Sequence, residues 1–502
     1  MRLMLENYIK SGYPAVAVLS PEEKRVLSEC QRIARRFSMN VAAWTTTNHL
    51  HYLHIDKSAS AGMGMVEKAR LKATDPVEAL NKSAQLLPNT IYCLLDFHPY
   101  WRSPDVWRTA KDMFQVQKRR GIVFVFISSV MDIPVELERE IAITTIPFPG
   151  REEMEPVIRK VSQAAQVEIP EDITAVADAA LGLTLSEAEN AFSLSLAMMK
   201  SFDPAIIMKE KEQIIHKSGV LEIVNAGLDM SSVGGLAVLK QWLRTRVSAF
   251  SPEAQAYGLP FPRGVLLVGV PGCGKSLSAK ALASEWQKPL LRLDAGRLFS
   301  SFVGETEANT RNALAVAEAV SPAVLWIDEI EKGLAGVQSS NRTDSGVTAR
   351  VFGHFLTWMQ EKKSPVFVVA TANDVSQLPP EFLRKGRFDE IFFVDLPDAE
   401  ERMQIFEAQL RRRRRDPQSF NLEVLSQAAE GFSGAEIEEA VIMGMFHAWS
   451  DDKREVNTED ILQAARLIIP MCRSEITRQR IEALREWGHR AARLANGTGS
   501  RK

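Results

Sequence analysis

Residues 269–276 read Gly-Val-Pro-Gly-Cys-Gly-Lys-Ser, and this octapeptide decides how the rest of the chain is interpreted. It fits the pattern G-x-x-x-x-G-K-[S/T] and lies between an apolar run at 264–270, GVLLVGV, and a helix-favouring segment at 276–286, SLSAKALASEW. Glycines permit a tight loop whose backbone N–H groups point at an anion, and the N-terminus of the helix adds its dipole. The pattern in this setting predicts a phosphate-binding loop. A purely structural glycine turn is the alternative, and the pair Lys275 and Ser276 in this frame argues against it.

The loop predicts ATP with Mg²⁺ as its ligand. Lys275 would neutralise charge on the β- and γ-phosphates, and the Ser276 hydroxyl can ligate Mg²⁺. The residues of the loop expected to contact the nucleotide are Gly269, Pro271, Gly272, Cys273, Gly274, Lys275, Ser276 and Leu277. The thiol of Cys273, close to a helix N-terminus and a lysine, could be acidified and oxidised. The alternative, which we prefer, is that a small polar residue simply fits at this place.

Two adjacent carboxylates follow a later apolar run. Asp328 closes the run AVLWID at 323–328, and Glu329 comes directly after it. A carboxylate at the carboxyl end of such a strand faces the phosphate loop of a parallel sheet. Asp328 would hold Mg²⁺ through water, and Glu329 would orient and deprotonate the attacking water. Taken alone, a carboxylate pair after an apolar run is more often a helix N-cap, which is the alternative interpretation.

Three further polar residues are candidates for the site. Asn373 closely follows the next apolar run, VFVVAT at 366–371, and could position the water or the γ-phosphate. An asparagine at a strand end otherwise serves turn chemistry. Arg384 and Arg387 lie beyond these strands, and we expect them at a subunit surface, where a guanidinium group can stabilise phosphoryl charge in a neighbouring subunit. Standing alone, the same arginines would be interpreted as solvated surface residues.

The surrounding pattern predicts the fold. Apolar runs alternate with helical stretches from 236 to 400, which is typical of a parallel sheet covered by helices. From Asp398 onward the pattern turns helical and predicts a small all-helical lobe, so the expected fold class is α/β with a helical lid. The expected boundaries are 1–216 for an N-terminal domain, 217–235 for a linker, 236–400 for the large α/β lobe, 401–472 for the helical lid lobe and 473–502 for a C-terminal helix and tail.

The N-terminal residues repeat this order in a diverged form. The segment VFVFISSVMDIPVELE aligns with VFVVATANDVSQLPPEFLR, and GLTLSEAENAF aligns with GFSGAEIEEAV. The copy has no G-K-[S/T] loop, and Phe97 follows Asp96 where a catalytic carboxylate would stand. We therefore expect a degenerate half that does not bind ATP productively and serves as a structural or recruiting platform. Two unrelated α/β lobes with chance matches are the alternative.

Composition narrows the classes of function. Of 502 residues, 61 are Lys or Arg and 63 are Asp or Glu, and a net charge of -2 gives no electrostatic case for a dedicated nucleic-acid binder. No apolar run reaches the roughly 18 residues of a membrane span, and the N-terminus has no secretory or transit character. The four scattered cysteines suit a reducing compartment. We expect a cytoplasmic protein.

From about 231 to 474 the chain resembles the AAA family of ATPases. The matching segments, in order, are SSVGGL, GVPGCGKS, SFVGETEANTRNA, LWIDEIEKG, VATAN, LPPEFLRKGRFDE, LPDAEER and GFSGAEIEEA. Within the family the chain looks most like the AAA proteins encoded in algal plastid genomes and their cyanobacterial and other bacterial relatives. A plastid stroma is therefore implied if the source is an alga. The resemblance implies an ATP hydrolase in which a P-loop sheet lobe and a helical lid follow a degenerate AAA-like half.

The resemblance also implies partners and residue roles. It implies a homo-oligomeric ring, usually hexameric, with ATP and Mg²⁺ bound between neighbouring subunits. The residues acting within one subunit would be Lys275, Ser276, Asp328, Glu329 and Asn373, and those reaching in from the next would be Arg384 and Arg387. Val233 and Gly234 would contact adenine, and Gly434 and Ala435 would close over the base and ribose.

One loop bears on what the hydrolysis drives. Phe302, Val303 and Gly304 match the aromatic–apolar–Gly loop that lines the central channel of AAA translocases, where an aromatic ring would grip extended polypeptide. The alternative is that Phe302 packs into the core. The leading hypothesis is an ATP-driven remodeller of a macromolecule, in the first place a protein. An ATP-controlled assembly switch with slow turnover is the alternative class, and a nucleic-acid-associated motor is disfavoured by charge.

Overall fold

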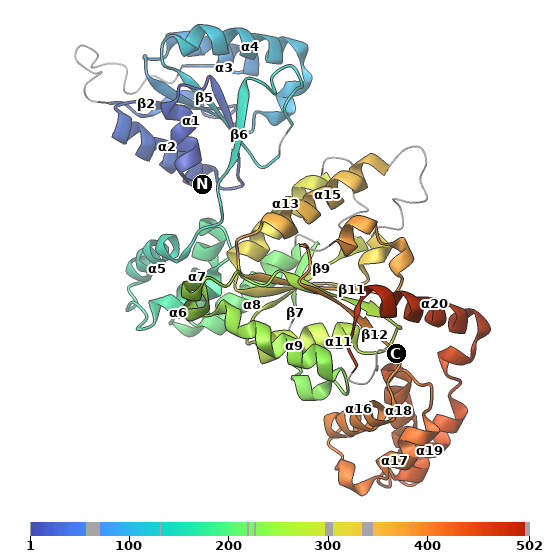
Figure 1. Ribbon diagram of the computed structural model, residues 1–502. Helices are drawn as coiled ribbons and strands as arrows, with labels where there is room; N and C mark the ends of the chain where they lie inside the picture. The colour runs from blue at the N-terminus through green and yellow to red at the C-terminus, as the bar shows by residue number, and fades with distance from the viewer. Residues whose placement is uncertain are drawn as a thin grey trace. The chain divides into compact units, whose positions relative to one another are not determined.

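The computed structural model describes residues 2–56, 71–130, 132–217, 220–224, 227–296, 305–333, 345–384 and 386–496. The chain divides into two compact units, Met1–Asp178 with Leu183–Ser201, and Ala179–Gly182 with Phe202–Lys502. Each unit contains one mainly parallel sheet (Figure 1). No described helix is long and apolar enough to cross a membrane.

The sheet of the second unit has the strand order β13-β12-β8-β11-β10-β9-β7. Its strands are β7 (Leu221–Val224), β8 (Gly264–Gly269), β9 (Leu290–Leu293), β10 (Ala323–Ile327), β11 (Val366–Ala372), β12 (Glu390–Val394) and β13 (Arg493–Leu494). Neighbouring strands pair in parallel, except β7, which is antiparallel to β9. The three apolar runs predicted as strands form β8, β10 and β11, and all their residues are buried, as expected for strands covered on both faces.

Helices cover both faces of this sheet, with α9 and α11 on one side and α13 and α15 on the other (Figure 1). The helices of the sheet lobe are α8 (Pro204–Lys217), α9 (Ala237–Val247), α10 (Pro252–Tyr257), α11 (Lys275–Glu285), α13 (Glu305–Ala319) and α15 (Ser345–Glu361). The helical lobe consists of α16 (Ala399–Arg412), α17 (Leu422–Ala428), α18 (Gly434–Ser450) and α19 (Thr458–Leu467). The last helix, α20 (Glu475–Ala491), returns to the sheet, where Gly488 packs so closely that a Cβ there would lie 2.4 Å from the Phe393 ring.

Three helices of the helical lobe, α16, α18 and α19, begin with capping boxes. Asp398 and Glu401 cap α16 reciprocally, and Ser433 and Glu436 do the same for α18. In such a box each side chain accepts a hydrogen bond from the other residue's backbone N–H, which satisfies two donors that the helix itself leaves unpaired. The caps fix where these helices start, and the start of α18 lines the cavity described below.

The first unit contains a sheet of order β3-β2-β4-β5-β1-β6, in which only β3 runs antiparallel to its neighbour. Its strands are β1 (Ala15–Leu19), β2 (Asn40–Thr45), β3 (His49–His54), β4 (Thr90–Leu95), β5 (Val123–Ser128) and β6 (Ile141–Thr145). Its helices are α1 (Arg2–Lys10), α2 (Glu23–Phe37), α3 (Pro76–Lys82), α4 (Pro104–Lys118), α5 (Arg151–Ala165), α6 (Ile173–Ala180) and α7 (Leu185–Met199). Alternate residues of β1 and β4 pack into two different apolar clusters, so this sheet too is covered on both faces.

The two sheets share the order of five parallel strands. Starting from β6, the first sheet runs β6-β1-β5-β4-β2, and starting from β12 the second runs β12-β8-β11-β10-β9. An antiparallel strand follows in each sheet, but β3 comes after β2 in the chain whereas β7 precedes β8. A Thr184–Glu187 capping box begins α7, in the place that the Ser433–Glu436 box takes at α18. The prediction that an AAA-like α/β half precedes the main sheet lobe is therefore confirmed at the level of fold.

Candidate nucleotide site

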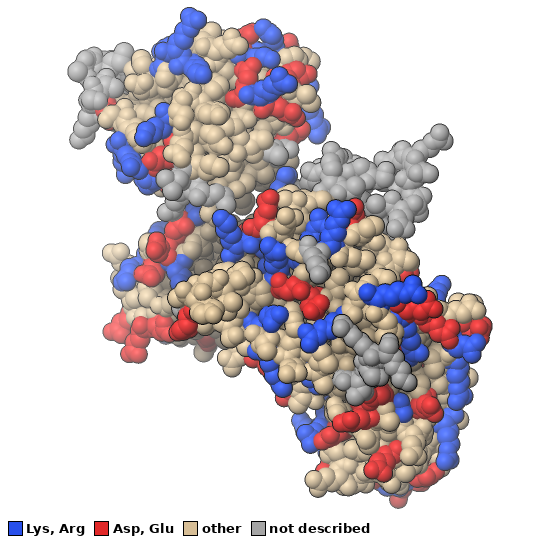
Figure 2. All heavy atoms as spheres, in the orientation of Figure 1, with Lys and Arg blue, Asp and Glu red and all other residues tan. Residues whose placement is uncertain are grey.

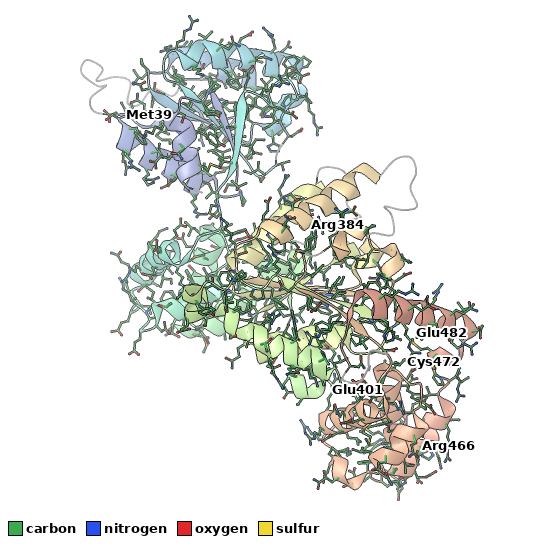
Figure 3. The ribbon with its side chains drawn as sticks, viewed as in Figure 1. Met39, Arg384, Glu401, Arg466, Cys472 and Glu482 are labelled. Carbon is green, nitrogen blue, oxygen red and sulfur yellow. The ribbon has the colours of Figure 1, made fainter. Side chains whose placement is uncertain are left out.

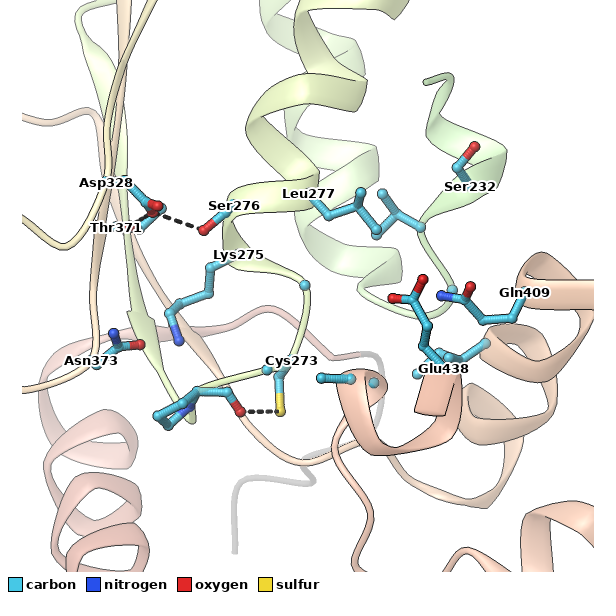
Figure 4. A pocket seen from close by; sticks show the side chains of 18 of the residues that line it. Ser232, Cys273, Lys275, Ser276, Leu277, Asp328, Thr371, Asn373, Gln409 and Glu438 are labelled. Carbon is cyan, nitrogen blue, oxygen red and sulfur yellow. Dashed lines mark hydrogen bonds between the residues drawn. The ribbon is translucent and has the colours of Figure 1, made fainter. Parts of the chain in front are cut away.

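A cavity of about 310 Å³ lies at the carboxyl ends of β8, β10 and β11, between the sheet lobe and the helical lobe of the second unit (Figure 4). Its lining comes from six segments that are far apart in the sequence. The lining residues are Ser232, Val233, Gly234, Pro271, Gly272, Cys273, Gly274, Lys275, Ser276, Leu277, Asp328, Glu329, Thr371, Asn373, Ile405, Gln409, Arg412, Gly434, Ala435 and Glu438. Of the cavity residues expected from the sequence within one subunit, only Gly269 is missing from this set.

Gly269 ends β8 beneath the loop. A Cβ at this position would lie 1.9 Å from the carbonyl oxygen of Val394 in the neighbouring strand, so only glycine lets the two strands approach. Its own carbonyl oxygen accepts a hydrogen bond from the Lys275 side chain at 2.8 Å. Gly269 therefore supports the phosphate loop through its backbone. It lets β8 and β12 approach, and its carbonyl oxygen holds the side chain of Lys275.

Lys275 is the buried cation of the loop. It is the first residue of α11, only 5% exposed, and its Nζ donates to the carbonyl oxygens of Gly269 and Val270 at 2.8 and 2.7 Å. Burial lowers the pKa of Lys275 to about 8, because removal from water penalises the charged form. Figure 4 shows its amino group between the loop and Asn373, at the end of the cavity opposite Gln409. An anion at this end would restore the charge that burial disfavours.

This pKa predicts a pH dependence of nucleotide binding. Affinity is expected to fall as the pH rises through about 8, because the free protein then loses the Lys275 proton and binding has to take it up again. The phosphate groups, whose last pKa is about 6, are already ionised over this range. Calorimetry in two buffers of different ionisation enthalpy would measure the proton uptake directly. An affinity that stays constant to about pH 9 would contradict the assignment of Lys275 as the phosphate partner.

A chain of hydroxyl and carboxylate oxygens lies next to Lys275. The Oγ of Ser276 and the Oγ1 of Thr371 both donate to the same oxygen, Oδ1 of Asp328, each at 2.7 Å. These are oxygen ligands of the kind Mg²⁺ takes, and Mg²⁺ is usually held by only one or two protein groups together with water and phosphate. Among the described residues no cluster of three or more His, Cys, Asp or Glu forms a self-sufficient metal site. The donor set thus fits a magnesium ion that arrives with its nucleotide.

Glu329 is held from both sides. Asn373 donates from Nδ2 to Oε1 of Glu329 at 3.0 Å, and the ammonium of Lys332 pairs with Oε2 at 2.5 Å. The backbone N–H of Asn373 donates in turn to Glu331, whose buried carboxyl has a raised pKa, mainly because of desolvation. The side chain of Asn373 is therefore hydrogen-bonded to Glu329, the carboxylate that the sequence predicts to be the general base. It does not serve to stabilise a turn.

Cys273 is inert. Its side chain is buried at 9% exposure, and burial raises the pKa of the thiol to about 12, with the opposing effect of Lys275 smaller. Reactive cysteines need a thiolate near neutral pH. The idea of an acidified, oxidisable thiol is contradicted, and the preferred alternative of a small residue that fits the loop agrees with the structure.

The far end of the cavity is made by the segment before α9 and by the helical lobe. Val233 and Gly234 lie there together with Gly434 and Ala435, as the family resemblance implied. A Cβ at Gly234 would lie 2.6 Å from the backbone nitrogen of Ile405, so this segment lies directly against α16. The Ala435 N–H donates to the Gly272 carbonyl at 3.0 Å, which ties the start of α18 to the phosphate loop.

Six lining residues were not found from the sequence: Ser232, Thr371, Ile405, Gln409, Arg412 and Glu438. A signal existed for some of them. Thr371 precedes Asn373 by two residues in β11, next to the strand that carries Asp328. Ile405, Gln409 and Arg412 follow one another at helical spacing on α16 and so share one face. Only the fold shows that this face, and Glu438 of α18, turn toward the phosphate loop.

Arg384 and Arg387 do not line the cavity. Arg384 is exposed, on the segment between β11 and β12 (Figure 3). Arg387 is half-buried, and its guanidinium donates to the backbone carbonyl of Glu381. Phe302 and its neighbours 301, 303 and 304 lie outside the described residues.

The corresponding place in the first unit carries acids. Glu23 is the first residue of α2, where α11 has Lys275, and Asp96 follows β4 as Asp328 follows β10. Burial and the neighbouring Asp96 raise the pKa of Glu23. A cavity of about 700 Å³ lies here, and in it Oε1 of Glu22 accepts the Leu185 N–H at 2.7 Å. Glu23 thus stands where the phosphate loop has its lysine. Two of the cations that also line this cavity, Arg25 and Lys160, are paired with Glu22, Glu153 and Glu189.

Comparison with known proteins matches the chain to a family of ATPases. A family model described as "ATPase family associated with various cellular activities (AAA)" matches residues 265–396. An AAA domain-containing protein called ycf46, from Guillardia theta, is 37% identical over 484 residues, which cover 95% of this chain and 93% of the relative. The chain belongs to the AAA ATPase family. Its nucleotide-binding ATPase domain is the second unit, which carries the matched residues.

Other comparisons extend the AAA assignment over the whole chain. The ycf46 protein of Pyropia yezoensis is 36% identical over 500 residues, 98% of this chain and 99% of the relative. Models of the N-terminal and second domains of SpoVK-like AAA ATPases match residues 1–146 and 152–218. The proteasome-activating nucleotidase of Saccharolobus solfataricus is 31% identical over 292 residues, 56% of this chain and 70% of the relative.

Proposed function

We propose that this AAA ATPase hydrolyses Mg²⁺-bound ATP within a ring of identical subunits, usually six, and uses the cycle to remodel a protein. The observation that carries the proposal is an incomplete site. One subunit supplies a phosphate loop, two carboxylates and Asn373, while Arg384 and Arg387 lie outside the cavity. A second subunit packed against this cavity could supply the missing positive charge, which is the arrangement that makes hydrolysis depend on assembly.

Within one subunit the residues take distinct roles. Lys275 would bind the β- and γ-phosphates, and Ser276 and Asp328 would hold Mg²⁺, which when bound neutralises phosphoryl charge. Glu329 would accept the proton of the attacking water, a step for which its carboxylate has to be ionised. Asn373 would keep Glu329 in place through the bond between their side chains. Val233, Gly234, Gly434 and Ala435 would enclose the base and ribose.

The distribution of charge favours a protein over a nucleic acid as the substrate. The five-arginine run 411–415 is largely neutralised: Arg411 pairs with Glu407, Arg412 and Arg413 with Glu438, and Arg415 with Glu455. Figure 2 shows Lys and Arg interspersed with Asp and Glu on the visible face. Nucleic-acid binding depends on unpaired positive charge laid along the phosphate backbone. Neither the arginine run 411–415 nor the visible face offers such an array of unpaired positive charge.

The first half would act as a platform without nucleotide of its own. Glu23 supports this part of the proposal, since it stands at the start of α2 where the phosphate loop has its lysine. We propose that the domains and their linker span residues 1–216, 217–235, 236–400, 401–472 and 473–502. The proposed location is a reducing compartment, the cytoplasm or, in an alga, the plastid stroma.

Phe302→Ala tests remodelling against the alternative of an assembly switch. Under remodelling, the variant should assemble and keep its basal ATP turnover but lose the stimulation of turnover by an unfolded polypeptide such as casein. An aromatic ring in a channel contributes apolar contacts to any extended chain, and alanine removes them. Under the switch hypothesis, partner binding and function in cells would be unchanged. Loss of folding would place Phe302 in the core, because truncating a buried Phe costs about 3–5 kcal/mol.

A further inference from the structure

The residues that follow α20 run along the outer edge of the second unit's sheet. In β13, Arg493 lies opposite Phe392 and Leu494 lies opposite Phe393 of β12. The next residue, Ala495, is 0% exposed, and its N–H donates to the Phe393 carbonyl at 2.9 Å. Residues 493–496, called here the tail strand, are therefore a fixed part of the sheet.

The tail strand caps α9. The first N–H groups of an α-helix have no partner inside the helix. At α9 the N-cap residue is Leu236, which offers no side-chain acceptor. The carbonyl oxygen of Ala495 accepts instead from the N–H groups of Val238 and Leu239, at 3.2 and 3.4 Å. A neighbouring strand thus takes the part that a Ser, Thr or Asp side chain usually plays.

Its last described residue reaches Glu401. The Nδ2 of Asn496 donates to Oε2 of Glu401 at 2.6 Å, and the other oxygen, Oε1, accepts the Leu236 N–H at 3.0 Å. Glu401 is only 7% exposed and lies at the junction of the sheet lobe and the helical lobe (Figure 3). Hydrogen bonds to a buried carboxylate are stronger than those between neutral groups. One carboxylate therefore joins the tail strand to the turn that enters α9.

That turn is the wall of the nucleotide cavity. Val233 and Gly234, three and two residues before Leu236, line it, and so does Ile405, one helical turn after Glu401. The fit is tight, because a Cβ at Gly235 would lie 2.7 Å from Oε1 of Glu401. The Glu401 carboxylate is thus one of the groups that position the Val233–Gly234 backbone, together with Gln404, which accepts the Gly235 N–H, and Lys240, which donates to the Val233 carbonyl oxygen.

We propose that Asn496 is a positioning residue for the base end of the nucleotide site, and that it acts through Glu401 on the backbone of Val233 and Gly234. The proposal rests on the proposed nucleotide site and adds to it a residue that touches no nucleotide. The proposal predicts that a change at Asn496 alters nucleotide binding only at the end of the cavity opposite Lys275. The phosphate loop, Asp328 and Glu329 share no hydrogen bond with the tail strand among those of the described residues.

The test is Asn496→Ala in the full chain. The Kd of ADP and the KM of ATP should rise about tenfold, the loss expected for one hydrogen bond to a charged group. The kcat at saturating ATP should stay within about twofold, since the reacting end is untouched. Inhibition by inorganic tripolyphosphate, which has no base, should be unchanged. The matched control is Arg493→Ala, in the same strand but with its side chain against Phe392 and Glu390, which should leave all three values unchanged.

Two outcomes would overturn the proposal. One is an unchanged ADP affinity in Asn496→Ala while the unchanged chain binds ADP. The other is a parallel loss of ADP and tripolyphosphate binding in both variants, which would mean that the tail strand only stabilises the fold. If the unchanged chain itself bound no nucleotide, the proposed function would fail instead. Should Asn496→Ala not fold, Asn496→Asp keeps the shape and turns the donor toward Glu401 into a second carboxylate, so the same loss should appear and be greater.

Discussion

Glu329→Gln is expected to bind ATP as tightly as the unchanged protein and to hydrolyse it about a hundred- to ten-thousand-fold more slowly. The amide has the shape of the carboxylate and can still accept the hydrogen bond from Asn373, which lies 3.0 Å away. It cannot take a proton from water, so only the chemical step is lost. The rate of ADP release at saturating ATP would measure the loss of hydrolysis, and calorimetry would measure the affinity for ATP.

Lys332→Ala provides the matched control. Glu329→Gln also removes the ion pair between Lys332 and Oε2 of Glu329, and Lys332→Ala removes that pair while leaving the carboxylate. If the carboxylate is the base, the lysine variant should retain turnover. Near-normal hydrolysis by Glu329→Gln would show that another group deprotonates the water. Equal losses in both variants would shift the role to the ion pair.

Arg387→Ala should bind ATP normally and lose about 10³–10⁵ in turnover, the range measured when a guanidinium supplied from outside a site is removed. Normal binding is expected because Arg387 does not line its own subunit's cavity. Mixing this variant with Lys275→Ala should restore part of the activity, since an intact Arg387 on one subunit then faces an intact phosphate loop on another. Arg384→Ala should behave in the same way.

The mixing experiment contains its own controls. Lys275→Ala alone should bind no ATP, because it removes the charge partner of the β- and γ-phosphates, and in the first unit Glu23 stands at the start of α2 where α11 has Lys275. Residual saturable binding in that variant would contradict the view that the first half has no nucleotide site. Absence of recovery in rings shown to contain both variants would contradict action between subunits.

The parts of the site that lie close together in sequence could be predicted from it. The loop 269–276, the pair Asp328 and Glu329 and residue Asn373 carry their signal in a few adjacent residues, each next to an apolar run. Gly269 shows the limit of this approach, because the pattern contains it although its task is to let β8 and β12 approach. Cys273 shows another, since its pKa depends on burial that no local pattern reveals.

Contacts between distant segments could not be predicted. Gln409 and Glu438 belong to helices whose residues look like ordinary amphipathic surface until the lobe folds back on the loop. The two-residue strand β13 follows a long helix and has no apolar run of its own, so nothing marks it as part of a sheet. The repeated strand order was detectable because strands of a parallel sheet leave long apolar runs even after the site has been lost.

The contacts around the first unit's cavity bear on where ATP can produce motion. Its α7 is tied to the loop before α2 by Glu22, and Arg25 of α2 joins Glu153 of α5 at 2.8 Å, so the segments that line the cavity are joined to one another without a ligand. A ligand shifts a conformational equilibrium only by binding one state better than another. If the first unit has no affinity for ATP, as we propose, it offers no such difference between states. Under that proposal the conformational work of ATP originates in the second unit.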